Sequence, residues 1–320
     1  MMMMSEVPFH ELSDAAARLS ESYRQSDEDG CHDWRGRTDV DWLAYVATRM
    51  PATFASTLAV FQELHDRCQP LVVRSLLDVG SGPATGLWAA DAVFSDLARA
   101  TLLEPEAGMR EIGARLLQGA ELSRRVVATW EANSATSFVS GSSFDVVLAA
   151  YVLGELTPSR RDLVIDAMWD TNGHAVVVIE PGSAEGFQRV IAARARLIKR
   201  GASIVAPCPH ARACPLPADD WCHFGARLNR SSLHRRLKGG TLGYEDEPYA
   251  YIVATRGQTE NSAARVIRRP RARPGHVLLR LCAHDGLQHE TISRRSSERY
   301  RLARKLAWGD RWVDGSAVNP

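Results

Sequence analysis

Hydrophobic and polar positions along the chain change their period near residue 75. Before that point, apolar residues recur at three- and four-residue spacings over residues 40–50 and 53–64, which predicts two helices with a break at Pro51. Short apolar runs follow, with helical patterns such as 85–97 between most of them, at 76–80, 100–104, 125–128, 144–150 and 175–180. Apolar strands that alternate with helices predict a mostly parallel sheet covered on both faces, and hence an α/β fold.

The pattern divides the 320 residues into four predicted segments, in a chain long enough for one large domain with additions or for two domains. A strand pattern returns at 249–255 and 276–282, and a helical pattern covers 297–308. The predicted segments are a helical N-terminal region at 1–70, an α/β core at 71–206, a cysteine-rich loop insertion without clear period at 207–240, and the remaining strands with a basic extension at 241–320.

Charge is unevenly distributed along the chain. Residues 256–312 hold 14 Lys and Arg against 5 Asp and Glu, so this segment contributes +9 to a net charge of +1 and the rest of the chain is −8. No apolar run approaches the ~18 residues of a membrane span, so no membrane partner is predicted. The N-terminus lacks the basic and apolar regions of a secretory signal. We therefore expect a cytoplasmic protein, in which Cys31 and Cys68 are free thiols.

The first strand pattern ends in a glycine-rich loop, Asp78-Val79-Gly80-Ser81-Gly82-Pro83-Ala84. Glycine at 80 permits a tight turn, glycine at 82 permits close approach of a ligand, and the next helix offers free N–H groups. The loop is shorter than the dinucleotide fingerprint, and Asp78 beside it suits a cationic ligand rather than a pyrophosphate. Glu104 ends the second strand pattern, where it can hold ribose hydroxyls. A glycine turn that binds nothing is the alternative.

This arrangement resembles motif I of the class I S-adenosylmethionine-dependent methyltransferases, whose fold is Rossmann-like. The resemblance implies that the methionine part of S-adenosylmethionine is held by Asp78, Gly80 and Gly82, and its ribose by Glu104. One departure is Ala84, where many of these enzymes have glycine. Tyr151 and Glu155 follow the fourth strand pattern, where such enzymes place substrate-side residues, although a packed tyrosine and a solvated glutamate are the simpler reading. No catalytic residue is predicted.

Four cysteines, with the spacing C-x5-C-x7-C-x59-C, form the second candidate site: Cys208, Cys214, Cys222 and Cys282. Zinc fingers and ribbons use closer pairs, but four thiolates suit either tetrahedral zinc or an iron–sulfur cluster. Four unrelated thiols are the remaining alternative. Three ligands from one loop and one from a distant strand would pin the predicted insertion to the sheet.

The motifs around these cysteines resemble a family of methyltransferase-like proteins of the small ribosomal subunit, found in bacteria and mitochondria. The resemblance spans about residues 45–312 and rests on ordered motifs in both halves: Arg49-Met50-Pro51-Ala52-Thr53, Cys208-Pro209-His210, Cys214-Pro215-Leu216, Asp220-Trp221-Cys222-His223-Phe224, Tyr244-Glu245-Asp246-Glu247, Leu281-Cys282, Ala303-Arg304-Lys305 and Trp308-Gly309-Asp310. It implies that the four cysteines hold a [4Fe–4S] cluster, with zinc as the alternative, and that the small ribosomal subunit and its rRNA are the partners.

Arginines cluster in the basic segment, and those predicted to contact RNA phosphates are Arg268, Arg269, Arg271 and Arg273. Few aromatic residues lie nearby, which favours recognition of backbone and shape over stacking on bases. The leading hypothesis is an S-adenosylmethionine-dependent methyltransferase acting on rRNA of the small subunit. The alternatives are a non-catalytic ribosome assembly factor and a small-molecule methyltransferase with structural zinc.

Overall fold

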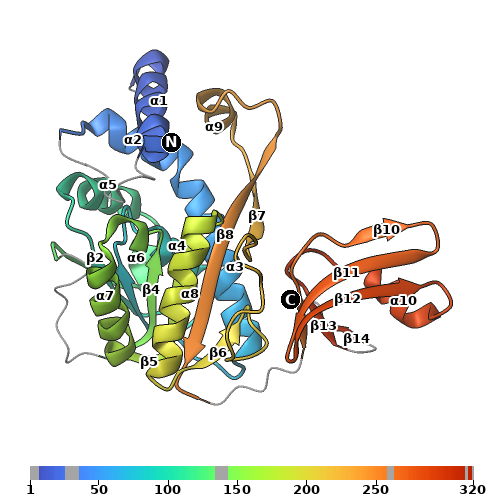
Figure 1. Ribbon diagram of the computed structural model, residues 1–320. Coiled ribbons are helices and arrows are strands. Elements are labelled where there is room, and N and C mark those ends of the chain that lie inside the picture. Colours follow the sequence, from blue (N-terminus) through green and yellow to red (C-terminus); the bar gives the residue numbers. More distant parts are fainter. Residues whose placement is uncertain (1–6, 26–35, 134–142, 258–262, 314–315, 319–320) are drawn as a thin grey trace.

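The computed structural model describes residues 7–25, 36–133, 143–257, 263–313 and 316–318. Figure 1 shows two units side by side, an α/β unit and a smaller β unit formed by the C-terminal residues. The helices are α1 (Phe9–Gln25), α2 (Asp39–Thr48), α3 (Met50–Arg67), α4 (Thr85–Asp91), α5 (Ala107–Leu117), α6 (Leu122–Arg125), the 3-10 helix η2 (Leu153–Glu155), α7 (Pro158–Thr171), α8 (Ala184–Lys199), α9 (Ser232–Leu237) and α10 (Ser297–Ala303). None of these helices is both long and apolar enough to cross a bilayer.

Strands of the main sheet have the order β3-β2-β1-β4-β5-β8-β6, with β7 also paired to β8. The neighbours from β3 to β5 are parallel, whereas β8 runs antiparallel to β5, β6 and β7. Their bounds are β1 (Ser75–Val79), β2 (Arg99–Leu103), β3 (Val127–Glu131), β4 (Phe144–Ala150), β5 (Asn172–Pro181), β6 (Ser203–Ala206), β7 (Phe224–Asn229) and β8 (Tyr244–Thr255). This order, with one antiparallel strand inserted beside β5, confirms the predicted Rossmann-like methyltransferase fold.

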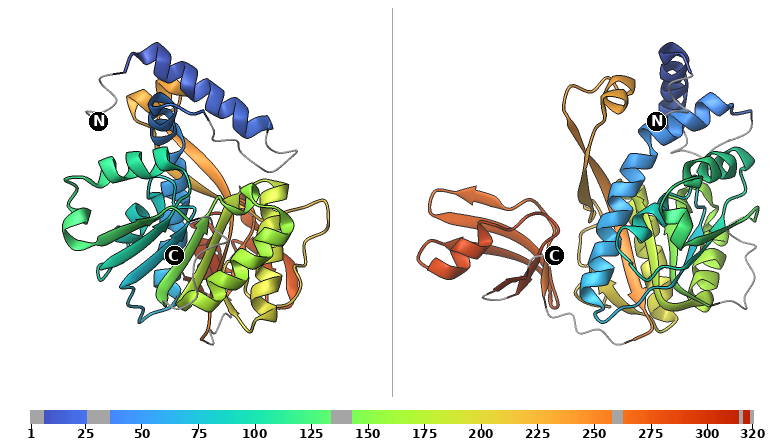
Figure 2. Two further views of the ribbon diagram at one scale, coloured as in Figure 1. Left: turned by 90° about the vertical axis from the view of Figure 1, so that its left-hand side faces the viewer. Right: turned by 180° about the vertical axis from the view of Figure 1, so that it is seen from behind.

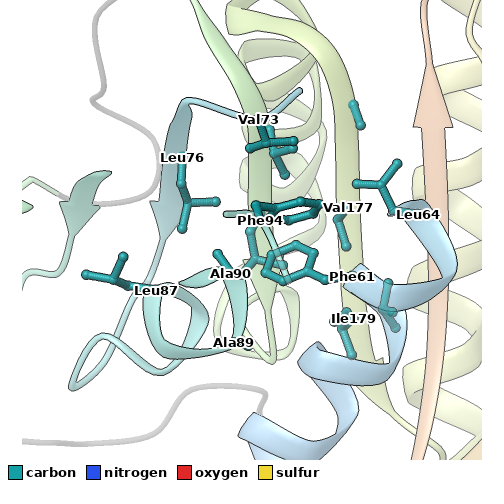
Figure 3. Close-up of a cluster of buried hydrophobic side chains, with 14 of the residues drawn as sticks. Phe61, Leu64, Val73, Leu76, Leu87, Ala89, Ala90, Phe94, Val177 and Ile179 are labelled. Carbon is teal, nitrogen blue, oxygen red and sulfur yellow. The ribbon is translucent and has the colours of Figure 1, made fainter. Parts of the chain in front are cut away.

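Two hydrophobic cores cover the two faces of this sheet, because successive side chains of a strand point to opposite faces. Leu76 of β1 packs against α3 and α4 in one core, while Leu77 and Val79 pack on the other face with α7 and α8. Figure 3 shows the first core, where Phe61 and Leu64 of α3 meet Phe94, with ring centroids of Phe61 and Phe94 5.3 Å apart. Asp78 follows the phase of Leu76, so its side chain lies on the face of α3 and α4.

The predicted elements differ from the observed ones mainly at their ends. The break predicted at Pro51 lies at Arg49, between α2 and α3, and Pro51 is in the first turn of α3, where its missing N–H costs nothing. The helix predicted over 85–97 ends at Asp91, although Phe94 and Leu97 remain buried in the core. The strand predicted at 125–128 begins at Val127, and the helix predicted over 297–308 ends at Ala303.

The cysteine-rich segment is a loop only in its first part. Residues 207–223 contain no helix or strand, but β7 and α9 follow, so the prediction of a loop over 207–240 is wrong for its second half. Buried and exposed residues alternate along β7 as expected for a strand, but six residues are too few for this alternation to be recognised in the sequence. The predicted boundary at 241 is followed directly by β8, a strand inside the main sheet.

The C-terminal unit has its own six-stranded sheet, of order β10-β11-β9-β13-β14 with β12 on β11. Its strands are β9 (Ala264–Val266), β10 (Arg271–Arg273), β11 (His276–Ala283), β12 (Gly286–Ser293), β13 (Arg311–Val313) and β14 (Ser316–Val318). A small core that includes Val277, Leu281 and Trp312 covers one face. The part of the predicted basic extension after β8 is therefore a folded β unit.

Candidate functional site

The cofactor loop, residues 80–84, is fixed at the ends of two neighbouring strands. The N–H groups of Gly80 and Ser81 donate to the carbonyl oxygen of Leu103 at 2.8 and 3.0 Å. Gly80 and Gly82 have φ angles of 68° and 53°, the left-handed region that favours glycine. A Cβ at position 80 would lie 2.4 Å from Cγ2 of Val152, so this turn requires glycine. Ala84 also has a positive φ, 67°, and is the N-cap residue of α4.

Asp78 supplies a buried carboxylate directly below this loop. It is 2% exposed, and its Oδ2 has no hydrogen-bond partner among the described residues. Burial, together with the nearby carboxylate of Glu104, raises the pKa of Asp78 to about 7, although the backbone N–H of Gly86 opposes the shift. A Cβ at position 86 would lie 2.4 Å from Asp78 Oδ2, so glycine is also needed there. A ligand with a positive charge or a hydrogen-bond donor would satisfy this oxygen.

Glu104 is joined to the loop by a hydrogen bond. Its Oε2 accepts from the N–H of Gly82 and its Oε1 from the N–H of Glu106, both at 2.9 Å. Burial raises the pKa of Glu104 above its usual value, against these two hydrogen bonds. Each carboxylate oxygen keeps a second lone pair for a hydroxyl donor. The structure thus brings together the four residues predicted for the cofactor: Asp78, Gly80, Gly82 and Glu104.

Helices α2 and α3 bring residues to this site that the sequence did not single out as site residues. The hydroxyl of Tyr45 would lie 3.8 Å from a Cβ at position 82. Burial raises the pKa of Tyr45, Arg49 opposes the shift, and Glu155, Glu104 and Asp78 add to it. The guanidinium of Arg49 lies 4.4 Å from the centroid of the Tyr23 ring. The positions of Tyr45 and Arg49 in the sequence pattern indicated only helices that pack on a core.

Tyr151, after β4, is held by hydrogen bonds rather than open to a substrate. Its hydroxyl donates to Ser56 Oγ at 3.1 Å or to Glu247 Oε1 at 3.3 Å, and its φ of 61° is unusual for tyrosine. Burial raises the pKa of Tyr151, and the charge of Glu247 adds to this. The packed reading of Tyr151 therefore describes this structure. Burial raises the pKa of Glu247 and the charge of Arg49 opposes this shift, whereas Asp78 and Glu104 are the carboxylates beside the loop, so the charge there suits a cationic ligand.

The four predicted cysteine ligands line one pocket between the α/β unit and the C-terminal sheet. Three come from the loop 207–223 and Cys282 comes from β11, while α8 and β8 close the pocket. All four are half-buried and unpaired to one another as disulfides. Burial raises the pKa of Cys222, with further contributions from the other three thiols, and burial raises the pKa of Cys282 to about 12. The thiols are therefore close enough to influence one another.

Their arrangement is nevertheless not that of ligands around one metal ion. Across the described ranges, no three His, Cys, Asp or Glu side chains are grouped in a way that could hold such an ion. The prediction of an iron–sulfur or zinc site is thus supported by the pocket that the four cysteines share. It is not supported by the arrangement of their side chains. Of the two other cysteines, Cys68 is half-buried at the end of α3, and Cys31 lies outside the described residues.

Buried arginines hold the cysteine loop in place, and the sequence gave no sign of this role. Arg194 of α8, 4% exposed, donates to the carbonyl oxygens of His210 at 2.6 Å and Arg212 at 2.8 Å. Arg265 of β9, 3% exposed, donates to the carbonyl oxygen of Pro207 at 3.2 Å and forms an ion pair with Glu63 of α3. This pair joins the C-terminal sheet to the α/β unit.

The four arginines predicted for RNA fall into two groups. Arg268 forms an ion pair with Asp220 and donates to the carbonyl oxygen of Trp221, so it holds the cysteine loop. Arg269 is 73% exposed and lies 3.5 Å from Asp246. Arg271 and Arg273 are exposed on β10. They pair with Leu278 and His276, so they share the face of the sheet that carries Cys282.

Comparison with known proteins adds relatives from mitochondria. The human protein named ribosome assembly protein METTL17, mitochondrial, is 29% identical over 286 residues, 84% of this chain and 61% of that protein. The Saccharomyces cerevisiae protein named ribosome assembly protein RSM22, mitochondrial, is 24% identical over 433 residues, 88% of this chain and 68% of that protein. The chain thus spans about three fifths of the human relative. Because these relatives are mitochondrial, the expectation of a cytoplasmic protein is contradicted.

Solved methyltransferases show a distant likeness. Magnesium protoporphyrin IX methyltransferase from Synechocystis PCC 6803, with bound S-adenosylmethionine, aligns over 77% of this chain and 97% of that chain, with a TM-score of 0.43 and 14% identity. The N-methyltransferase NodS from Bradyrhizobium japonicum WM9 aligns over 74% and 99%, with a TM-score of 0.43 and 13% identity. The fold assignment rests on the strand order described above.

A family model described as Rsm22, mitochondrial small ribosomal subunit Rsm22, matches residues 39–313. This range includes the cofactor loop, all four cysteines of the pocket and the C-terminal sheet through β13. It confirms the family resemblance predicted from the motifs. The chain belongs to the Rsm22 family of mitochondrial small ribosomal subunit proteins.

Proposed function

We propose that this chain binds S-adenosylmethionine and acts on the small ribosomal subunit as an assembly factor whose target is rRNA. The observation that carries the cofactor proposal is the buried oxygen of Asp78, which lacks a partner among the described residues beside the Gly82–Glu104 hydrogen bond. A cationic amino acid moiety would neutralise Asp78, and Glu104 would accept hydrogen bonds from ribose hydroxyls. When bound, the cofactor supplies an activated methyl group on a sulfonium.

Calorimetric titration with S-adenosylmethionine tests this proposal. Asp78→Ala and Glu104→Ala should each abolish measurable binding. Asp91→Ala is the matched control, because Asp91 forms a surface ion pair with Arg125 at 2.5 Å and should bind as the parent protein does. Equal affinity for all three variants would exclude the assigned site.

Two candidate activities share this cofactor site. The first is methyl transfer to a nucleotide of small-subunit rRNA, and the second is a non-catalytic role in which the bound cofactor stabilises the assembly factor. The second has one observation in its favour: the hydroxyl of Tyr151, the first side chain after β4, is occupied by Ser56 and Glu247. Mapping modified rRNA nucleotides in a deletion strain separates them, since only the first predicts a missing methyl group.

We further propose that the four cysteines hold a [4Fe–4S] cluster. The donor set supports this, since four soft thiols line one pocket, and Arg194 and Arg265 hold the loop that carries three of them. Each thiolate of such a cluster binds a different iron, so the four sulfurs stand farther apart than around one zinc ion. Zinc is the alternative, and with it a small-molecule methyltransferase.

Anaerobic purification provides the test. An iron–sulfur protein is brown, absorbs near ~400 nm and contains iron and sulfide, and Cys222→Ser should remove all three signals. Cys68→Ser is the control, because Cys68 lies at the end of α3 outside the pocket. A colourless protein with stoichiometric zinc would support the alternative and exclude the cluster.

The names of the relatives and the charge of the C-terminal sheet support rRNA as partner. Arg271 and Arg273 are exposed on β10, where they can contact phosphates. Co-sedimentation with small-subunit particles should weaken in the double variant Arg271→Glu and Arg273→Glu. The control is Arg124→Glu, an exposed arginine of α6 far along the sequence. Unchanged co-sedimentation of the double variant would remove β10 from the interface.

A further inference from the structure

A second cavity lies where α3, the β7–β8 ladder and the C-terminal sheet meet. Its volume is about 470 Å³, enough for a large side chain with water. The right-hand view of Figure 2 shows α3 on the flank of the α/β unit that faces the C-terminal sheet. The cavity shares one wall with the cysteine pocket, formed by Phe224, Tyr251 and Arg265, but no cysteine lines it. It takes no part in the proposed cofactor or cluster site.

Aromatic rings form the deep wall of this cavity. Phe224 of β7 is buried, with its ring centroid 5.4 Å from that of Tyr251 and 6.5 Å from that of Trp308. Tyr249 lies 5.6 Å from Tyr251, measured between ring centroids. Aromatic faces carry negative electrostatic potential, so such a wall suits a flat cation as well as an apolar group.

Three carboxylates line the cavity. Ala59, Gln62, Glu63 and Asp66 line the cavity from α3, and Gln62, Glu63 and Asp66 lie three, four and seven residues after Ala59, on the same side of the helix. Gln62 and Asp66 are exposed, whereas Glu63 is buried. Asp310 lines the cavity from the C-terminal unit, and burial raises its pKa. Three carboxylates therefore face a space lined by a single guanidinium.

The guanidinium of Arg265, the cation in the lining, already makes hydrogen bonds within the chain. Its Nε donates to Pro207, its two terminal nitrogens donate to Glu63, and Nη1 also donates to the carbonyl oxygen of Gly309. Arg67, which is not part of the lining, also pairs with Glu63 at 3.1 Å. Glu63 is thus neutralised by two arginines. Asp66 has no hydrogen bond or ion pair among the described residues, so it is available to a ligand.

We propose that this cavity binds the guanidinium of an arginine side chain presented by a protein partner. Its flat cation can stack on the aromatic wall while its fork of N–H donors meets the carboxylates of Asp66 and Asp310. A nucleotide could also stack there, but the same carboxylates would repel its phosphate. The cavity is therefore a protein-docking site, distinct from the basic face of β10.

Saturation-transfer NMR with L-argininamide and the full-length chain tests the proposal. We expect a dissociation constant on the order of 1 mM, typical of a ligand of this size. Asp66→Asn should weaken binding by roughly two- to five-fold, as for an exposed ion pair. Gln62→Arg should abolish it, because the new side chain would supply a competing guanidinium at the opening. Gln118→Arg adds the same charge on an exposed position at the end of α5 and should bind as the parent does.

Three further ligands decide the chemistry. Citrulline amide has the shape of argininamide without its charge, and we expect no binding. Guanosine monophosphate should not bind in the cavity, so its saturation-transfer signal should be the same for the parent protein and for Gln62→Arg. Tighter binding of spermidine at the same site would overturn the assignment to a protein side chain, and a citrulline amide signal equal to that of argininamide would overturn the assignment to a cation. Unaltered S-adenosylmethionine affinity in each variant shows that the fold is intact and separates this test from the proposed function.

Discussion

The cofactor loop and the cysteine pocket both border the main sheet but are assembled differently. The loop is a single turn between β1 and α4, and its hydrogen-bond partners Leu103 and Glu104 come from the adjacent strand. The pocket joins a 207–223 loop to Cys282, which lies 60 residues beyond Cys222 on another sheet. The first site needs only the α/β unit, whereas the second exists only while the C-terminal sheet is docked.

This contrast shows how the two sites depend on stability. A site built from neighbouring strand ends survives local opening elsewhere in the molecule. A site shared by two units is lost whenever the units separate, so its stability is set by the free energy of that separation. The joint between the units is carried by the buried pair of Arg265 and Glu63 and by the pairs that Asp220 makes with Arg268 and Arg280. Substitutions in one region at a time test whether the two sites respond independently.

The largest effect is expected at the joint. Arg265→Ala leaves the buried carboxylate of Glu63 facing only Arg67 and should lower the free energy of unfolding by about 3–5 kcal/mol. Urea unfolding followed by fluorescence measures this loss. Arg125→Ala, which breaks the surface pair with Asp91, should cost less than about 1 kcal/mol. S-adenosylmethionine affinity should stay at the parent value in Arg265→Ala below its unfolding transition; equal losses of cofactor and cluster would erase the contrast.

The next effect is expected at Asp78, within the local site. Its pKa is raised from 3.8 to about 7 in the folded chain, so the folded state holds this proton more tightly than the unfolded state. The stability contributed by the protonated form is fully present below about pH 4 and is lost as pH rises to 7. The shift corresponds to at most roughly 4 kcal/mol. Asp78→Asn should therefore raise the melting temperature at pH 8 while removing cofactor binding.

Binding and stability should move in opposite directions with pH at this residue. The parent protein should bind S-adenosylmethionine about ten-fold more weakly per pH unit below 7, because the carboxylate must lose its proton to meet a cation. Melting curves and titrations from pH 5 to 8 measure both trends. A parent affinity that is flat over this range would mean that Asp78 does not contact the cofactor.

The local site could be predicted from the sequence because its residues lie at fixed offsets from apolar runs. Asp78 and Glu104 each mark the end of a predicted strand, and adjacent parallel strands place such ends together. Tyr45 and Arg49 could not be assigned in this way. The pattern around them is that of amphipathic helices, and only the tertiary packing shows that the Tyr45 hydroxyl lies near Gly82 and that Arg49 acts on Tyr45.

For the cysteine pocket, the sequence predicted the four cysteines but not the arginines that hold the surrounding loop. The cysteine spacing indicated the four residues, and resemblance to a family supplied the cluster that they would hold, but Arg265 was not singled out among the arginines of the basic segment. Its burial depends on Glu63, 202 residues earlier, and no local pattern encodes such a pair. Likewise Arg268 was assigned to RNA, although its partner Asp220 holds it against the cysteine loop. Long-range ion pairs are invisible to periodicity.

A smaller loss is expected from a change in the cofactor loop itself. Gly80→Ala places a Cβ 2.4 Å from Val152 at a φ of 68°, and should cost about 1–3 kcal/mol together with cofactor affinity. Gly119→Ala is the matched control, because its φ of 76° carries the same backbone strain with no atom within 4 Å. The difference between the two variants in urea unfolding isolates the contact with Val152. A loss no greater than that of Gly119→Ala would show that the loop tolerates a side chain.

The smallest effect on stability is expected on β10, where the change should instead appear in binding. Arg271→Ala with Arg273→Ala should alter the free energy of unfolding by less than about 0.5 kcal/mol, because both side chains are exposed. If each contacts a phosphate, the slope of log affinity for rRNA against log salt should decrease by roughly 1 to 2. Arg268→Ala should leave that slope unchanged and instead loosen the cysteine loop by releasing Asp220, which would appear as faster proteolysis within 207–223. If Arg268→Ala instead decreased the salt slope and left proteolysis of the loop unchanged, the RNA contact would lie at the joint between the units rather than on β10.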